Sequence, residues 1–143
     1  MATSFGHKVI VDTGFWIALF DPRDRRHDEA VVKKSVLSKL SIVLPWPCLY
    51  ETLRTRFVKN LSGVKSLEEF LGRPNISLVD DDYYKKRAYE LTIKGASKGR
   101  TISMIDMLIR LMLDDKELRI THLLTFNEKD FVDVCRIRQI ELL

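Results

Sequence analysis

The sequence VIVDTG, residues 9–14, decides the fold. Its three consecutive β-branched residues are typical of a strand that is buried on both faces, as the strands of parallel sheets are. The glycine that follows is a turn signal, so the strand should end at Asp12. Solvation alone does not explain an aspartate in this place, because it directly follows an apolar run.

Further apolar segments continue this pattern along the chain. Strands that alternate with helices favour right-handed crossovers and a parallel sheet that is covered on both faces. We therefore expect an α/β fold, a three-layer α/β/α sandwich with a mainly parallel four- or five-stranded sheet. The expected strands are residues 9–11, 42–44, 76–79, 123–126 and 137–142, and the expected helices are residues 15–20, 28–40, 49–60, 66–71, 83–94 and 104–113.

Length and composition fit one domain, which we place at residues 1–143. The chain is 45% hydrophobic and 31% charged, and a chain of this length can bury a core without disulfide support. No apolar run reaches the roughly 18 residues of a membrane-spanning helix. Cys48 and Cys135 form neither a dense disulfide framework nor a metal-ligand spacing, so we expect a reduced, cytoplasmic chain. The net charge of +4 indicates only a mild preference for binding polyanions.

Three carboxylates are candidates for chemistry, and each also has an ordinary structural explanation. Asp12 ends a buried strand, but it could simply start a turn or cap the next helix. Glu51 follows the second expected strand, early in a helix, and could be a glutamate without a special role. Asp106 lies in the first turn of a helix that Ser103 can cap, where the helix dipole favours any anion. Taken singly, these residues leave both explanations open.

A fourth polar segment, residues 125–131, follows the strand at 123–126 and contains Asn127 and Asp130. Alone, it reads as a polar loop that ends in a helix cap. All four regions, however, fall at strand ends or at the helices that start there, where parallel sheets bind ligands. Carboxylates held together repel one another unless a cation lies among them. Oxygen ligands suit Mg²⁺ or Mn²⁺, which activate water and stabilise the charge that develops on a phosphodiester.

Other common chemistries lack their residues. No glycine-rich phosphate-binding loop is present. His7, His27 and His122 are scattered, without an evident arrangement of nucleophile, histidine and acid. A phosphatase that uses Asp12 as its nucleophile usually has a second aspartate two residues later, where this chain has Gly14. That residue counts against the phosphatase hypothesis.

The candidate motifs follow one another in an order that spans nearly the whole chain. They are Val9-Ile10-Val11-Asp12-Thr13, Asp21…Asp24…His27…Ala30, Tyr50-Glu51, Ser103…Asp106 and Leu124-Thr125-Phe126-Asn127…Asp130-Phe131. This ordered set resembles the PIN domain, and in particular the VapC-type toxins of prokaryotic toxin–antitoxin modules. The resemblance implies a Mg²⁺- or Mn²⁺-dependent endonuclease of RNA, usually a homodimer and often neutralised by a small antitoxin protein.

The resemblance also implies roles for single residues. Asp12 and Asp106 would be metal ligands, and Glu51 would support the metal or its water. A fourth group would come from the end of the last long strand, and two residues compete for this role. Asn127 stands where many members of the family have aspartate, and Asp130 follows three residues later. This departure keeps an alternative open, a PIN-like module that binds RNA or a protein and has weak or no nuclease activity.

Two basic clusters offer a route for RNA, because lysine and arginine bind phosphates without reading sequence. Each cluster could equally be an ordinary solvated helix face. The clusters are Arg54, Arg56 and Lys59, which follow Glu51, and Lys94, Lys98 and Arg100, which surround a glycine-containing loop before Asp106.

Apolar residues on the early helices could form a surface for an antitoxin or for a second copy of the chain. Burial in the core is the alternative, and it is favoured for Phe15. The candidates are Phe15, Trp16, Trp46 and Leu49.

Overall fold

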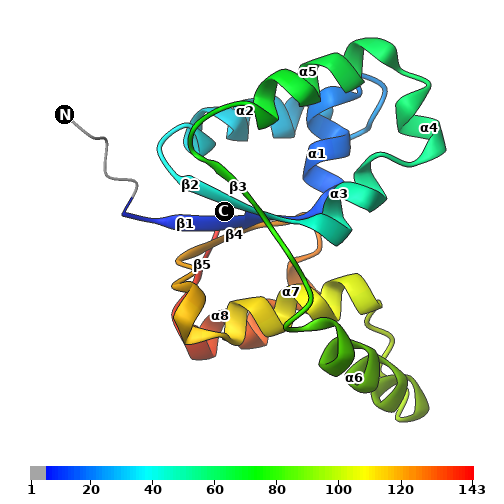
Figure 1. Ribbon diagram of the computed structural model, residues 1–143, viewed down its shortest axis with the longest axis vertical. Coiled ribbons are helices and arrows are strands. Elements are labelled where there is room, and N and C mark those ends of the chain that lie inside the picture. The colour runs from blue at the N-terminus through cyan, green and yellow to red at the C-terminus, as the bar shows by residue number, and fades with distance from the viewer. Residues whose placement is uncertain (1–5) are drawn as a thin grey trace.

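The computed structural model describes residues 6–143 and contains a parallel sheet with helices on both faces (Figure 1). Its five strands lie in the order β3-β2-β1-β4-β5, and every neighbouring pair is parallel. This arrangement confirms the predicted α/β sandwich. The strands are β1 (Lys8–Val11), β2 (Ser41–Pro45), β3 (Ile76–Val79), β4 (His122–Leu124) and β5 (Glu141–Leu142).

The helices form the two outer layers. In Figure 1, α1, α2 and α5 lie on one side of the sheet, and α6, α7 and α8 lie on the other. Two short helices, α3 and α4, connect β2 to α5. The helices are α1 (Thr13–Phe20), α2 (His27–Leu37), α3 (Trp46–Thr52), α4 (Thr55–Val58), α5 (Leu61–Leu71), α6 (Lys85–Ser97), α7 (Met104–Asp114) and α8 (Val132–Arg138), with single 3-10 turns η1 (Lys116–Leu118) and η2 (Glu128–Asp130).

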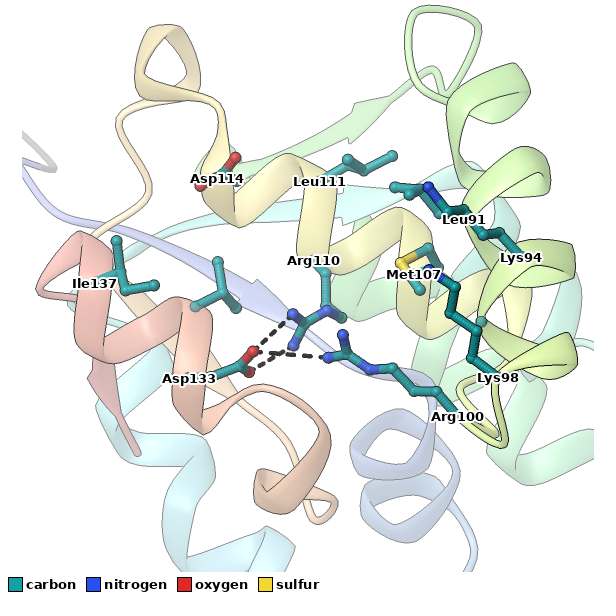
Figure 2. A pocket seen from close by; sticks show the side chains of 12 residues that line it. Leu91, Lys94, Lys98, Arg100, Met107, Arg110, Leu111, Asp114, Asp133 and Ile137 are labelled. Carbon is teal, nitrogen blue, oxygen red and sulfur yellow. Dashed lines mark hydrogen bonds and ion pairs between the residues drawn. The ribbon is translucent and has the colours of Figure 1, made fainter.

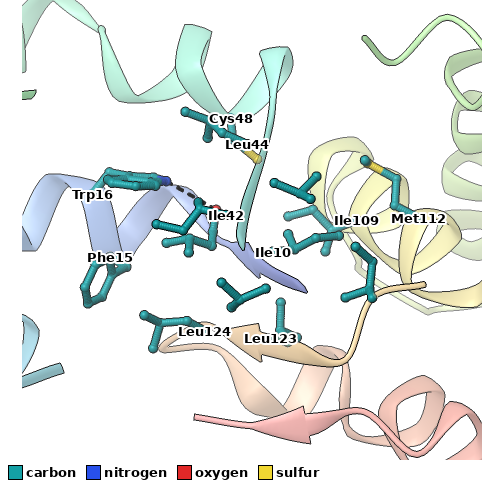
Figure 3. Close-up of a cluster of buried hydrophobic side chains, with 14 of the residues drawn as sticks. Ile10, Phe15, Trp16, Ile42, Leu44, Cys48, Ile109, Met112, Leu123 and Leu124 are labelled. Carbon is teal, nitrogen blue, oxygen red and sulfur yellow. Dashed lines mark hydrogen bonds between the residues drawn. The ribbon is translucent and has the colours of Figure 1, made fainter. Parts of the chain in front are cut away.

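The β-branched run of β1 lies at the centre of the core. Strands β2 and β4 flank β1, and helices cover both of its faces, so the side chains of Val9, Ile10 and Val11 are fully buried. Figure 3 shows Ile10 between the aromatic residues of α1 and the apolar face of α7, which carries Ile109 and Met112. The continuous apolar sequence of this strand is thus explained by burial on both faces.

The order of the strands places a crevice beside β1. The chain runs from β1 to β2 and β3 on one side, and then returns to add β4 on the other side of β1. In open α/β sheets, ligands bind at such a reversal, outside the carboxyl ends of the strands. The backbone N–H of Asp12 donates to the carbonyl of Leu124 over 3.0 Å, so both strands end together at this point.

The helix expected over residues 49–60 is wrong as one element. It begins earlier, at Trp46, where Pro47 is tolerated because the first N–H groups of a helix lack internal acceptors. It then breaks after Thr52, and α4 starts at Thr55. Apolar residues recur every four positions at Leu49, Leu53, Phe57 and Leu61, which predicted one helix, but Leu53 is 40% exposed and lies where the chain breaks.

The strand expected over residues 137–142 is also largely wrong. Residues 132–138 form α8, and only Glu141 and Leu142 belong to β5. Gln139 ends α8 in the left-handed region, with a φ of 57°. Arg136 and Arg138 lie in the last turn of α8, where basic side chains favour a helix C-terminus.

The glycine-containing loop, expected at residues 95–99, lies later in the chain. Helix α6 extends to Ser97 and includes Gly95, so the turn is formed mainly by residues 98–103. Gly99 adopts a φ of 79°, which residues with a side chain rarely adopt.

The apolar surface expected on the early helices is wrong for Trp16 and Leu49, whereas Phe15 is buried in the core, as favoured for it. Phe15 and Trp16 have no exposed surface, and Leu49 is buried too, because α1 packs between the sheet and its neighbouring helices. Trp46 alone of the four is exposed, at 37%, and it contacts the exposed ring of Tyr50.

The cysteines and the absence of a long apolar run are the two remaining features of the sequence. Cys48 and Cys135 are both free and buried. Within residues 6–143, no helix combines the length and the apolar character that crossing a membrane requires.

Candidate functional site

Asp12 lies at the junction of β1 and α1 and is 9% exposed. Its Oδ1 accepts a 2.7 Å hydrogen bond from the backbone N–H of Thr13, and its Oδ2 accepts a 2.9 Å bond from the hydroxyl of Thr125. Asp12 therefore does cap α1, as its ordinary explanation requires, but the bond from Thr125 goes beyond a cap. The hydroxyl of Thr13 points elsewhere and donates to the carbonyl of Cys48 over 3.4 Å.

Asp106 is placed by the start of α7. Ser103 caps this helix, and its Oγ accepts a 3.1 Å hydrogen bond from the backbone N–H of Asp106. The cap fixes the first turn, and the helix dipole favours a carboxylate there. The predicted capping by Ser103 is thus confirmed, and Asp106 is partly buried.

Asn127 links Asp106 to the segment that follows β4. Its Nδ2 donates to Oδ2 of Asp130 over 2.6 Å and to Oδ2 of Asp106 over 3.4 Å. Its backbone N–H donates to the hydroxyl of Thr125 over 3.0 Å, and the same hydroxyl donates to Asp12. One hydrogen-bonded network therefore connects four of the five candidate residues.

Glu51 approaches the same region from α3. It lies in the second turn of this short helix, which ends one residue later at Thr52, and its side chain is exposed. Within residues 6–143, its carboxylate makes neither a hydrogen bond nor an ion pair. Glu51 is therefore the free member of the candidate set.

Burial and like charges destabilise the ionised form of Asp12. Burial is the largest cause and raises the pKa of Asp12 above its ordinary value. The hydrogen bonds from Thr125 and Thr13 lower the pKa, and the charges of Glu51 and Asp130 raise it again. The net result is a raised pKa.

Burial and like charges also destabilise the ionised form of Asp106. Burial raises its pKa first, the charges of Asp12, Asp130 and Glu51 raise it further, and the pKa reaches about 6. Burial also raises the pKa of the Cys48 thiol, with further contributions from three of these carboxylates. The four acids thus share one electrostatic environment, and a cation placed among them would relieve their repulsion.

The chemistry of this donor set fits a hard divalent cation. Mg²⁺ is usually held by one or two carboxylates and keeps several waters, and Asp12 with Asp106 offers such a pair. The only three acids of residues 6–143 that bring one ligand atom each within 4.8 Å of one another are Asp80, Asp81 and Asp82, which follow β3. The candidate carboxylates therefore interact through their charges without being drawn together to that spacing.

Two residues in and around this network were missed as functional positions. Thr125 was noted only as part of a polar loop, because its contact with Asp12 depends on β4 pairing with β1. Arg110 of α7 makes two hydrogen bonds to Asp133, of 2.6 and 2.8 Å, and a third of 2.8 Å to the carbonyl of Asp130. The spacing of Asp106 and Arg110, four residues apart in a helix, was the available signal.

The two basic clusters lie in different layers. Arg54, Arg56 and Lys59 lie at α4, where Arg56 lines hollows that also contain Asp21. Lys94, Lys98 and Arg100 line a groove between α6, α7 and α8 (Figure 2).

Solved structures share this fold. VapC20 of Mycobacterium tuberculosis, described as a sarcin-ricin loop cleaving toxin, aligns with a TM-score of 0.67 and 21% identity, over 87% of this chain and 94% of that chain. A chain of VapBC2 from Rickettsia felis, bound to a DNA fragment from their promoter, aligns with a TM-score of 0.59 and 20% identity, over 95% and 97%. No family model and no curated protein matches the sequence. The chain therefore has the PIN-like fold of VapC structures, as the resemblance of its motifs implied.

Proposed function

We propose that this chain is a Mg²⁺- or Mn²⁺-dependent endoribonuclease and the toxin of a toxin–antitoxin pair. One observation carries the proposal. Asp12, Asp106, Asn127 and Asp130 form one network at the point where the strand order reverses. The proteins with this fold include a toxin that cleaves an RNA loop, which supports RNA as the substrate class.

In the proposed site, Asp12 and Asp106 would hold the cation. When bound, the cation lowers the pKa of a coordinated water and offsets the charge on the phosphoryl oxygens. The bonds from Thr125 and Thr13 fix the carboxylate of Asp12, so it loses little conformational freedom when it binds a ligand. Asn127 donates to both Asp106 and Asp130 as a neutral group, where a further carboxylate would add repulsion.

Glu51 has a different role in this proposal. It is exposed, and within residues 6–143 nothing restrains its carboxylate, so it can turn toward a water or a phosphate at the site. We assign it to orienting the attacking water and accepting its proton at a carboxylate oxygen. The reaction is hydrolysis: the water oxygen bonds to phosphorus, and the bond from phosphorus to the leaving ribose oxygen breaks.

The partners belong to the same proposal. The VapBC2 structure supports a small antitoxin as a partner of this fold, and we also propose a homodimer. Trp46, Tyr50 and Leu53 are exposed and lie within five residues of Glu51 in the sequence. They are the first choice for the contact with the antitoxin.

An RNA cleavage assay tests the proposed function. The purified chain is incubated with single-stranded RNA in Mg²⁺ or Mn²⁺ and, in parallel, in excess chelator. Cleavage that needs the cation and stops with chelator supports the proposal. Binding of RNA without cleavage under both conditions would favour the alternative, a PIN-like module without nuclease activity.

A further inference from the structure

We propose that the groove between α6, α7 and α8 binds the RNA strand beside the phosphodiester that is cleaved. This proposal rests on the proposed function, and it assigns a ligand to a surface outside the carboxylate site. The groove has a volume of about 420 Å³. Its floor is aliphatic, and its cations gather where α6 leads into α7 (Figure 2).

The charges of the groove leave an excess of cations. Arg100 and Arg110 share one acid, Asp133, at 3.6 and 2.6 Å. Asp114, at the other end of the groove, is already paired with Arg138 over 2.8 Å.

Two lysines complete this excess. Lys94 and Lys98 are exposed and have no acidic partner within residues 6–143. Two full positive charges are therefore available to an anion, and a third comes from the arginine pair that shares one carboxylate.

The groove and the candidate active site share helix α7. Met107 lines it and directly follows Asp106 in α7. The guanidinium of Arg110, in the groove wall, donates to the backbone carbonyl of Asp130 over 2.8 Å. A strand whose phosphate lies at the carboxylates could therefore continue into the groove without leaving the surface.

Electrostatics explains why a nuclease of this kind needs such a groove. The candidate carboxylates repel a phosphate backbone, and a cation at the site offsets only part of that charge. Lysines beside the site attract the neighbouring phosphates without reading base sequence. The aliphatic floor offers an apolar contact to a ribose or base. Its residues are Leu91, Met107, Leu111, Val134 and Ile137.

Binding in chelator separates this proposal from catalysis. Fluorescence anisotropy of a labelled single-stranded RNA is measured against salt concentration for the parent chain and for Lys94→Ala/Lys98→Ala. Loss of two phosphate contacts should lower the slope of log K against log salt by about 1.4, because each contact to a single strand contributes roughly 0.7. At low salt, the affinity should fall roughly tenfold.

A matched variant controls for net charge. Lys39 and Lys65 are also exposed and unpaired within residues 6–143, but Lys39 precedes β2 and Lys65 lies on α5, in the layer on the other side of the sheet. Lys39→Ala/Lys65→Ala removes the same charge and should keep the parent slope. If both double variants bind RNA equally, the groove is not the RNA site.

A second pair of variants tests the floor. Ile137 lines the groove and Val32 lies on α2 in the other layer, and both are 74% exposed. Ile137→Glu should weaken RNA binding, whereas Val32→Glu should not. An Ile137→Glu variant that binds RNA like the parent would contradict the proposal. A protein segment would then be the favoured occupant of the groove.

The two proposals can fail separately. If the parent chain cleaves RNA and its groove variants bind RNA normally, the proposed function stands and the groove proposal is wrong. A parent chain that neither binds nor cleaves RNA contradicts both proposals.

Discussion

The hydroxyl of Thr125 donates a 2.9 Å hydrogen bond to Oδ2 of Asp12, although the two residues lie 113 positions apart. They meet because β4 pairs with β1 and each residue directly follows its strand. The same hydroxyl accepts from the backbone N–H of Asn127 over 3.0 Å. Thr125 thus connects Asp12, which follows β1, to Asn127, which follows β4.

Replacement of Thr125 tests this connection. Thr125→Val keeps the shape of the buried side chain but leaves Oδ2 of Asp12 without its donor, and such a loss typically costs about 1–3 kcal/mol. We expect RNA cleavage to fall at least several-fold and thermal stability to fall as well. Thr125→Ser should restore most of the activity, because it keeps the hydroxyl. Equal activity of the valine and serine variants would show that the bond does not position Asp12.

Asn127 and Asp130 compete for the role of the fourth site group. Asn127→Ala removes the donor between Asp106 and Asp130, so their repulsion should grow. Asp130→Ala removes a charge and relieves that repulsion. Cleavage rates of the two variants at saturating Mg²⁺ should differ, and the slower variant identifies the group that acts at the site. If both keep the parent rate, neither residue belongs to the site.

The pKa of Asp106 predicts a pH-dependent effect on stability. Its pKa of about 6 lies above the ordinary value of 3.8, so folding favours the protonated form. The resulting penalty is absent below the ordinary pKa, grows as the pH rises toward the folded pKa, and is complete above it. Asp106→Asn removes the penalty, so in chelator the variant should be the more stable protein above pH 6 and equal to the parent near pH 3.

Thermal unfolding against pH measures this difference. With allowance for the partial exposure of Asp106, we expect about 1 kcal/mol at neutral pH, or roughly 3 °C in Tm. A variant that is less stable than the parent at neutral pH would mean that the carboxylate makes favourable contacts that outweigh its repulsion.

A divalent cation should stabilise the folded chain. A ligand that binds only the folded state at one hundred times its Kd adds about 2.7 kcal/mol, so Mn²⁺ should raise the Tm of the parent measurably. Asp12→Asn should lose most of this shift, whereas Asp81→Asn, in the exposed acidic group after β3, should keep it. The reverse pattern would place the cation at Asp80, Asp81 and Asp82.

The parallel sheet could be predicted from sequence because its strands are short, continuous apolar runs separated by helical patterns. The run at 9–11 sets this pattern, and burial of β1 on both faces explains it. The end of the chain was harder to predict. Its residues combine apolar and basic side chains that fit a short helix as well as a strand. Burial of Val134 and Cys135 in the core favours the helix, α8.

The candidate site could be predicted only as a set of strand ends. Asp12, Asp106 and the segment with Asn127 were found because each follows a strand or starts a helix. Their hydrogen-bond partners depend on which strands are neighbours, and a single sequence does not contain that order. Thr125 and Arg110 were therefore missed, although both contact candidate residues.

Cleavage of RNA by Asp12→Asn tests the central claim most directly. The substitution keeps the shape of the side chain and removes one charge from a crowded site, so the fold should survive and relief of repulsion should offset the altered cap. Rates are compared with the parent and with Asp81→Asn at saturating Mg²⁺, and circular dichroism confirms folding of all three. We predict loss of most activity in Asp12→Asn and the parent rate in Asp81→Asn. If a folded Asp12→Asn variant cleaves RNA as fast as the parent, Asp12 acts only as a helix cap, and the proposed active site is contradicted.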